Sequence, residues 1–203
     1  MSARTDLSHW QKLFGNSNDA KLAYENLLLM YSEPHRYYHN LNHIEECLLK
    51  FDQVSGRCDR PKEVEIAIWC HDVIYDPKKS DNEEKSAEWT EEILRKVSWD
   101  HESIQRVFNL VVATKTHDSS TEDSKILNDI DLSILAAPKH RFLEYCDQIR
   151  NEYNHVPEDL YNMGRGKILL DFYKREKIFL TEAFQKDEIL AKENLKREID
   201  LLS

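Results

Sequence analysis

Residues 64–72 read VEIAIWCHD, and this stretch carries most of the information about the fold. Its first seven residues are apolar apart from Glu65, which favours a helix that is buried on several sides. His71 and Asp72 follow directly, so two polar side chains stand at the end of a buried helix. Neighbouring helical residues point about 100° apart, and both can therefore reach one ion only at the flank of the helix end.

Apolar residues recur at helical spacing on both sides of this stretch. Only four glycines occur, which leaves little turn chemistry for a β-sandwich or barrel. We therefore expect an all-α bundle of about eight to ten helices. The amphipathic sets are Ile44, Cys47, Leu48 and Phe51; Val107, Leu110, Val111 and Thr114; Phe142, Cys146, Ile149 and Tyr153; and Ala191, Leu195, Ile199 and Leu202.

The 203 residues fit one domain with a sizeable core. We expect a single domain over residues 1–203, with a metal-site core at about 36–136 and a helical C-terminal part at about 137–203. Pro138 and Pro157 are expected near the first turns of two later helices. The last helix, expected over 186–202, could pack internally or against a second subunit, so a homodimer stays open.

Charge and composition exclude several classes of protein. The formal net charge of −10 argues against extended nucleic acid as a partner, whereas a small phosphorylated substrate stays compatible. The four cysteines form no CxxC pair, and no stretch approaches the ~18 apolar residues of a membrane span. With no apolar leader at the N-terminus, we expect a cytoplasmic protein that does not engage a membrane.

Two further segments place histidines and aspartates at ligand spacing. In YHNLNHI, residues 38–44, His39 and His43 are four apart and would share one face of a helix. In NDIDLS, residues 128–133, Asp129 and Asp131 supply carboxylates. Imidazole and carboxylate together suit a divalent metal such as Mn, Fe, Co, Ni or Zn, and carboxylates also tolerate Mg. Each segment alone could be structural, so the prediction depends on all three.

The order H…HD…D resembles the HD superfamily of metal-dependent phosphohydrolases, in particular a bacterial branch of about two hundred residues. The matching segments are YHNLNHI (38–44), HDVIYD (71–76), DNEEKSA (81–87), TKTH (114–117) and DIDLSIL (129–135). The resemblance covers residues 38–135 and continues more weakly to the end. It implies an HD-type helical domain that hydrolyses a phosphate ester or anhydride of a small molecule, with a nucleotide as the candidate.

Two of these segments are also similar to those of cyclic-nucleotide phosphodiesterases. That similarity implies metal ligands at His43, His71, Asp72 and Asp131, and a general acid at His39. Asp129 is the alternative to Asp131. Asp76 stands where those enzymes have a further histidine, so neither a second metal nor a cyclic nucleotide is implied.

Four other residues have a catalytic or binding interpretation beside a structural one. Glu83, or an aspartate such as Asp72, could orient the attacking water, but Glu83 could also be a helix N-terminal carboxylate after an Asn82 cap. His117 could bind substrate or metal, or be a cation at a helix end. Arg150 and Arg165 could clamp a phosphate, or be solvated.

Two rival functions remain open at this point. One is a metal- or nucleotide-binding sensor without catalysis. The other is a di-iron oxygenase, which would need additional histidine ligands such as His39 and His117.

Overall fold

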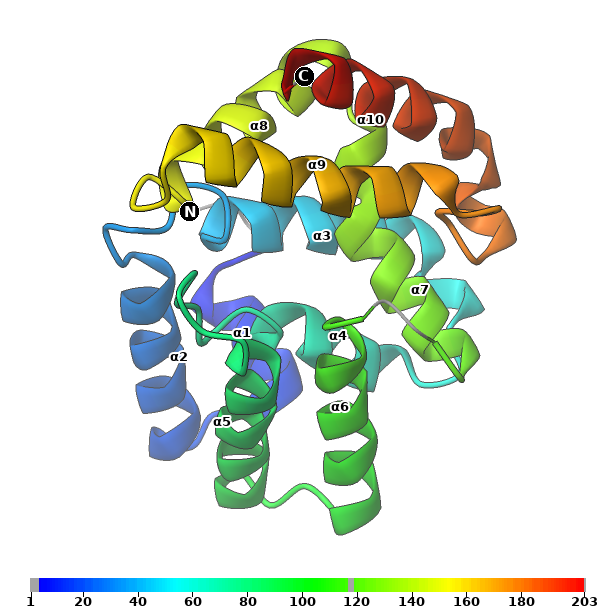
Figure 1. Ribbon diagram of the computed structural model, residues 1–203. Helices are drawn as coiled ribbons and strands as arrows, with labels where there is room; N and C mark the ends of the chain where they lie inside the picture. The colour runs from blue at the N-terminus through cyan, green and yellow to red at the C-terminus, as the bar shows by residue number, and fades with distance from the viewer. Residues whose placement is uncertain (1–3, 117–118, 203) are drawn as a thin grey trace. The chain divides into compact units, whose positions relative to one another are not determined.

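The computed structural model describes residues 4–116 and 119–202. The described chain is helical throughout, without a strand, so the prediction of an all-α protein is confirmed. It divides into two compact units, Met1–Asn128 and Asp129–Ser203 (Figure 1). The single domain expected over residues 1–203 stays a prediction.

The first unit contains six complete α-helices and the start of a seventh among the described residues. α5 packs along α6, α4 contacts α3, α5 and α6, and α2 contacts α1 and α5. The bounds are α1 Leu7–Phe14, α2 Asn18–Tyr31, α3 Leu41–Val54, a 3-10 turn Ser55–Arg57, α4 Pro61–Cys70, α5 Asn82–Lys96, α6 His101–Ala113 and α7 Glu122–Asp131.

The helix α4 lies in the core of the first unit, as its apolar sequence predicts. Pro61 occupies its first turn, where the missing N–H costs nothing. Its residues from Ile66 to Cys70 are fully buried. The Trp69 ring meets the Trp10 ring edge-on at 5.5 Å between centroids, which ties α1 to α4. The end of α4 is therefore held on several sides.

The second unit begins within α7 and contains three further α-helices. α10 contacts α8, α9 and both 3-10 segments of this unit. The bounds are a 3-10 segment Leu132–Ala136, α8 Lys139–Glu152, α9 Glu158–Lys174, a 3-10 segment Glu182–Asp187 and α10 Glu188–Leu202. Pro138 and Pro157 directly precede α8 and α9, one residue before the first turns in which they were expected.

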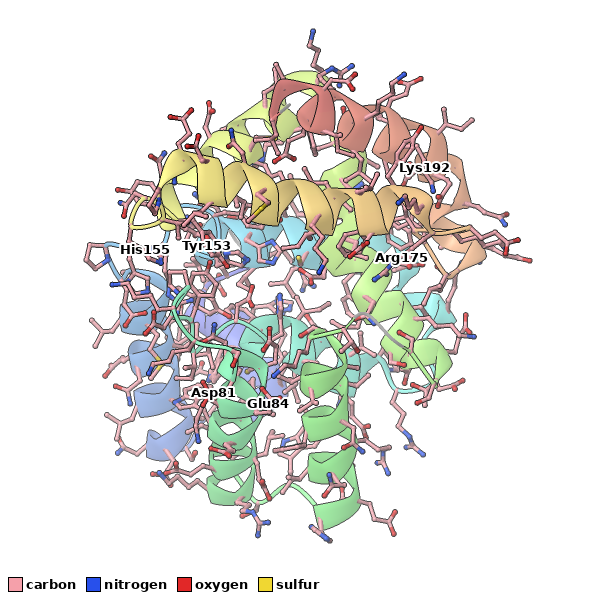
Figure 2. The ribbon with its side chains drawn as sticks, in the orientation of Figure 1. Asp81, Glu84, Tyr153, His155, Arg175 and Lys192 are labelled. Carbon is pink, nitrogen blue, oxygen red and sulfur yellow. The ribbon has the colours of Figure 1, made fainter. Side chains whose placement is uncertain are left out.

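A lysine side chain from α10 caps the C-terminus of α9. The Lys192 ammonium donates to the carbonyl oxygens of Tyr173 and Arg175 at 2.7 and 2.5 Å (Figure 2). A cation at a helix C-terminus satisfies carbonyls that have no helical partner. None of the helices in the described ranges combines the length and apolar character needed to cross a bilayer.

Candidate metal centre

His71 is the residue that caps the C-terminus of α4. Its Nδ1 lies 2.9 Å from the carbonyl oxygen of Ile68, one turn earlier. A carbonyl oxygen can only accept, so Nδ1 carries a hydrogen, and in the neutral imidazole Nε2 then keeps its lone pair. Metal-binding histidines are oriented in this way by a backbone carbonyl. The end of α4 thus presents one nitrogen ready to act as a ligand.

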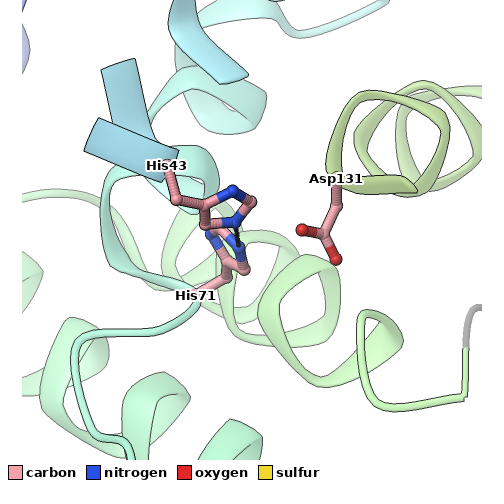
Figure 3. Close-up of side chains that lie close together, drawn as sticks. All are labelled: His43, His71 and Asp131. Carbon is pink, nitrogen blue, oxygen red and sulfur yellow. Dashed lines mark hydrogen bonds between the residues drawn. The ribbon is translucent and has the colours of Figure 1, made fainter. Parts of the chain in front are cut away.

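His43 lies in the first turn of α3, which begins after an asparagine cap. The Asn40 side chain accepts a hydrogen bond from the backbone N–H of Asn42 at 2.9 Å. The His43 side chain is 2% exposed. Its Nε2 lies 3.2 Å from the Nε2 of His71 (Figure 3). Two histidines that are 28 residues apart in the sequence therefore direct the same ring atom to one point.

Asp72 adds a carboxylate to the two imidazoles. Its Oδ2 lies 3.5 Å from His43 Nε2 and 3.2 Å from His71 Nε2. Burial raises the pKa of this carboxyl. The charge and hydrogen bond of His71, together with the charges of His39 and His43, lower the pKa by more than burial raises it. The net result is a pKa well below the ordinary value. Asp72 is therefore an anion at neutral pH, as a metal ligand must be.

The separations among these three donor atoms can be compared with those around a bound ion. Ligand atoms at about 2.0–2.2 Å from a tetrahedral ion lie about 3.3–3.6 Å from one another. The observed separations of 3.2, 3.2 and 3.5 Å are close to this range. Two nitrogens and one carboxylate oxygen also suit a divalent transition metal. The donor separations in the first unit are therefore compatible with such an ion.

Asp131 is the last residue of α7. Its side chain carries the carboxylate that the resemblance implies as a metal ligand, and Figure 3 labels it together with His43 and His71. Asp131 belongs to the second unit, whereas both histidines belong to the first. Its role as a ligand is part of the proposal below.

Asp129, the alternative to Asp131 as a metal ligand, has a structural role within the second unit. Its side chain is fully buried. The carboxylate accepts hydrogen bonds from the backbone N–H groups of Leu180 and Thr181, both at 2.7 Å, and from the Thr181 hydroxyl at 2.6 Å. A carboxylate that is already bound to three donors is poorly suited to a metal. These contacts argue against Asp129 as a metal ligand.

One detail of the predicted site is wrong. His39 and His43 do not project from one face of a helix, because α3 begins at Leu41 and His39 lies in the preceding turn. The two rings still meet edge-on, with centroids 6.1 Å apart. The His39 ring also stacks on the Tyr75 ring at 4.2 Å. His39 is therefore next to the cluster and reaches it from a turn.

A residue beside the candidate site that the sequence did not indicate is Arg36. Its guanidinium is fully buried. It donates to the carbonyl oxygens of His39 (3.0 Å), Asp72 (2.6 Å) and Val73 (2.9 Å). It thus ties the turn that carries His39 to the turn that carries Asp72. An arginine in a polar, proline-containing segment gives no sign of such burial, because the partners are backbone carbonyls.

Glu83 lies in the first turn of α5 and is half-buried. The expected cap residue, Asn82, is instead the first residue of the helix, and Asp81 precedes it as the N-cap. The Asn82 side chain bonds both the N–H and the C=O of Asp76, at 3.0 Å each. Figure 2 shows Asp81 and Glu84 at this end of α5. The catalytic role of Glu83 stays a prediction.

The two candidate phosphate-binding arginines have partners within the second unit. Arg150 donates to the carbonyl oxygens of Tyr153 and Val156. Arg165 donates to Glu198 at 2.8 Å and to the Tyr145 hydroxyl at 3.0 Å.

These contacts favour a structural role for Arg150 and Arg165, both of which are half-buried and not fully solvated. His117, the third candidate for substrate binding, lies outside the described residues.

Comparison with protein-family models, with curated proteins and with solved structures found no significant match for this chain.

Proposed function

We propose that this chain is a metal-dependent phosphohydrolase of HD type, acting on a phosphate ester or anhydride of a small molecule such as a nucleotide. The observation that supports it is the convergence of His43 Nε2, His71 Nε2 and Asp72 Oδ2 within 3.5 Å of one another. The resemblance of residues 38–135 to the HD superfamily supplies the class of reaction.

The proposed ligand set is His43, His71, Asp72 and Asp131. The first three come from the ends of α3 and α4, and the fourth from the end of α7. Because four protein ligands fill a tetrahedral ion, water and substrate would bind as a fifth or sixth ligand, which ions such as Mn and Mg accept. A divalent ion bound there supplies Lewis acidity and lowers the pKa of a water molecule toward neutrality.

The roles of the protein's own residues follow from where they lie. His71, with its Nδ1 bonded to Ile68, keeps a fixed tautomer. His39 would donate a proton to the leaving oxygen of the substrate, because its ring lies beside the cluster and is not one of the proposed ligands. Glu83 would accept a hydrogen bond from the attacking water and orient it.

The test is to purify the protein without chelators and measure bound metals by elemental analysis. The same sample is then assayed with Mn, Co, Ni and Mg against nucleotides and bis(p-nitrophenyl) phosphate. We expect about one transition metal per chain and phosphate release, with both lost in His71→Ala and Asp72→Ala. His101→Ala is the matched control, because His101 is exposed in the first turn of α6.

Other outcomes would separate the rival functions. Full turnover by a metal-free His71→Ala protein would refute the mechanism. Metal without turnover would favour a sensor, and iron with an O₂-dependent spectrum would favour an oxygenase. A folded protein that binds no metal at all would mean that the two histidines and Asp72 form only a hydrogen-bonded core cluster.

A further inference from the structure

The imidazole of His39 is covered on one face by the ring of Tyr75. The two centroids are 4.2 Å apart and the planes differ by 25°. The Tyr38 ring meets the same imidazole edge-on, at 5.0 Å and 81°. Stacked and edge-on contacts of this kind restrict how an aromatic ring can turn. The orientation of the His39 side chain is thus set by two neighbouring rings.

Tyr75 is itself fixed at its ring and at its backbone. The guanidinium carbon of Arg36 lies 5.5 Å from the Tyr75 centroid and 5.2 Å from that of Tyr31. His35 Nε2 donates to the Tyr75 carbonyl oxygen at 2.8 Å. Because Arg36 also holds the His39 carbonyl at 3.0 Å, one buried guanidinium fixes both the backbone of His39 and the ring stacked on it.

From this arrangement we infer that Tyr75 is a positioning residue for His39, holding the imidazole plane in the orientation needed for proton transfer. Its catalytic consequence rests on the proposed function. A general acid must lie within hydrogen-bond reach of the leaving atom, and a ring free to rotate spends little time there. Tyr75 itself contacts neither the proton nor the leaving oxygen in this role, so it acts only through His39.

The kinetic test compares Tyr75→Leu with Tyr75→Phe on a nucleoside 5′-monophosphate in the presence of Mn, because its leaving alkoxide needs a proton whereas p-nitrophenolate leaves without one. Tyr75→Leu should lower kcat about tenfold, less than the roughly hundredfold expected for His39→Ala. KM and metal content should stay within about twofold of wild type. Tyr75→Phe keeps the stacking ring and should restore most of the activity. Tyr173→Leu, the same change at an exposed position on α9, is the control.

A double-mutant cycle shows whether Tyr75 acts through His39. In the His39→Ala background, Tyr75→Leu should lower kcat no further. An equal tenfold loss in both backgrounds would overturn the inference, because Tyr75 would then act independently of His39. A raised KM with unchanged kcat would also overturn it, because Tyr75 would then contact substrate. A Phe variant as defective as the Leu variant would assign the effect to the hydroxyl and not to the ring.

A second measurement does not depend on activity. Ring proton signals of the zinc-loaded protein, labelled at histidine, are recorded by NMR, and the His39 signal is the one missing from His39→Ala. It should move in Tyr75→Leu, which removes the ring current, and stay near its place in Tyr75→Phe. An unmoved signal in Tyr75→Leu would refute the stack. If wild type hydrolyses nothing, the proposed function fails, while this measurement still decides the positioning.

Discussion

Replacing Asp129 tests which aspartate near the end of α7 stabilises the fold and which belongs to the proposed metal site. The Asp129 carboxylate accepts three hydrogen bonds, from two backbone N–H groups and one hydroxyl of residues 180–181. Asp129→Ala would leave all three donors without this partner. A buried hydrogen bond to a charged group contributes about 1.5–3 kcal/mol. Three such bonds would contribute about 4.5–9 kcal/mol if they were additive. Because they share one carboxylate, their contributions are not additive, and we expect the free energy of unfolding to fall by about 4–6 kcal/mol, a large part of a typical total.

Asp129→Asn is the milder change, because the amide keeps one acceptor oxygen. That oxygen can take the place of Oδ2 and keep both bonds to Thr181. The amide nitrogen then faces the N–H of Leu180, and one bond is lost. We expect a loss of about 2–3 kcal/mol. Urea unfolding followed by far-UV circular dichroism should show a lower midpoint with an unchanged slope.

Asp131→Asn is the matched comparison two residues along the same helix. It should lose bound metal in elemental analysis while its unfolding midpoint, measured with chelator present, changes much less than that of Asp129→Asn. Asp129→Asn should keep its metal wherever it is folded. The opposite pattern, with metal lost from Asp129→Asn at unchanged stability, would refute the assignment of the two carboxylates.

Three further predictions concern the first unit. Glu63 is buried and bonded by the Arg106 guanidinium at both oxygens. Glu63→Gln loses one of these two charge-assisted bonds, so the free energy of unfolding should fall by about 2 kcal/mol; an unchanged urea midpoint would contradict this. Burial, and then the Asp123 carboxylate, raise the pKa of Cys58 to about 12. The Cys58 thiol should therefore react with a disulfide reagent at pH 8 far more slowly than free cysteine. Comparison with Cys58→Ser identifies the part of the reaction signal that comes from Cys58. The backbone hydrogen bond that caps α6 lowers the pKa of Asp100 below its ordinary 3.8. The stability that the Asp100 carboxylate contributes is therefore present above pH ~4 and is lost as the pH falls through the lowered pKa of the folded protein. Melting curves from pH 2 to 7 should show less acid destabilisation in Asp100→Asn than in wild type.

Much of the site in the first unit was predictable from the sequence. The apolar run that precedes His71 and Asp72 predicts a buried helix, because few other arrangements bury Val64 together with the five consecutive apolar residues 66–70. His43 was predictable for a related reason, since the apolar spacing from Ile44 to Phe51 places α3 in the core. Local periodicity was sufficient to place both helices in the core, whereas the assignment of His43, His71 and Asp72 as ligands came from the family resemblance and stays a prediction.

The remaining features depend on contacts that periodicity does not record. The predicted start of α3 was wrong because Asn40 could equally be a helical residue or an N-cap. Only the hydrogen bond from the Asn42 N–H to its side chain shows that it is the N-cap. The burial of Arg36 depends on backbone carbonyls from a segment that is 36 residues away at Asp72. The structural role of Asp129 depends on its hydrogen bonds to residues 180–181, and no pattern in the sequence links Asp129 to these residues.

The burial of α4 on several sides has a consequence for how this chain tolerates change. Its interior can accept conservative substitution, since one apolar side chain can replace another of similar volume. An insertion or deletion of a single residue is different, because it turns everything beyond it by about 100°. The shifted helix would still find apolar neighbours, yet His71 would point away from His43. The length of α4 between Pro61 and His71 is thus under a stricter constraint than its composition.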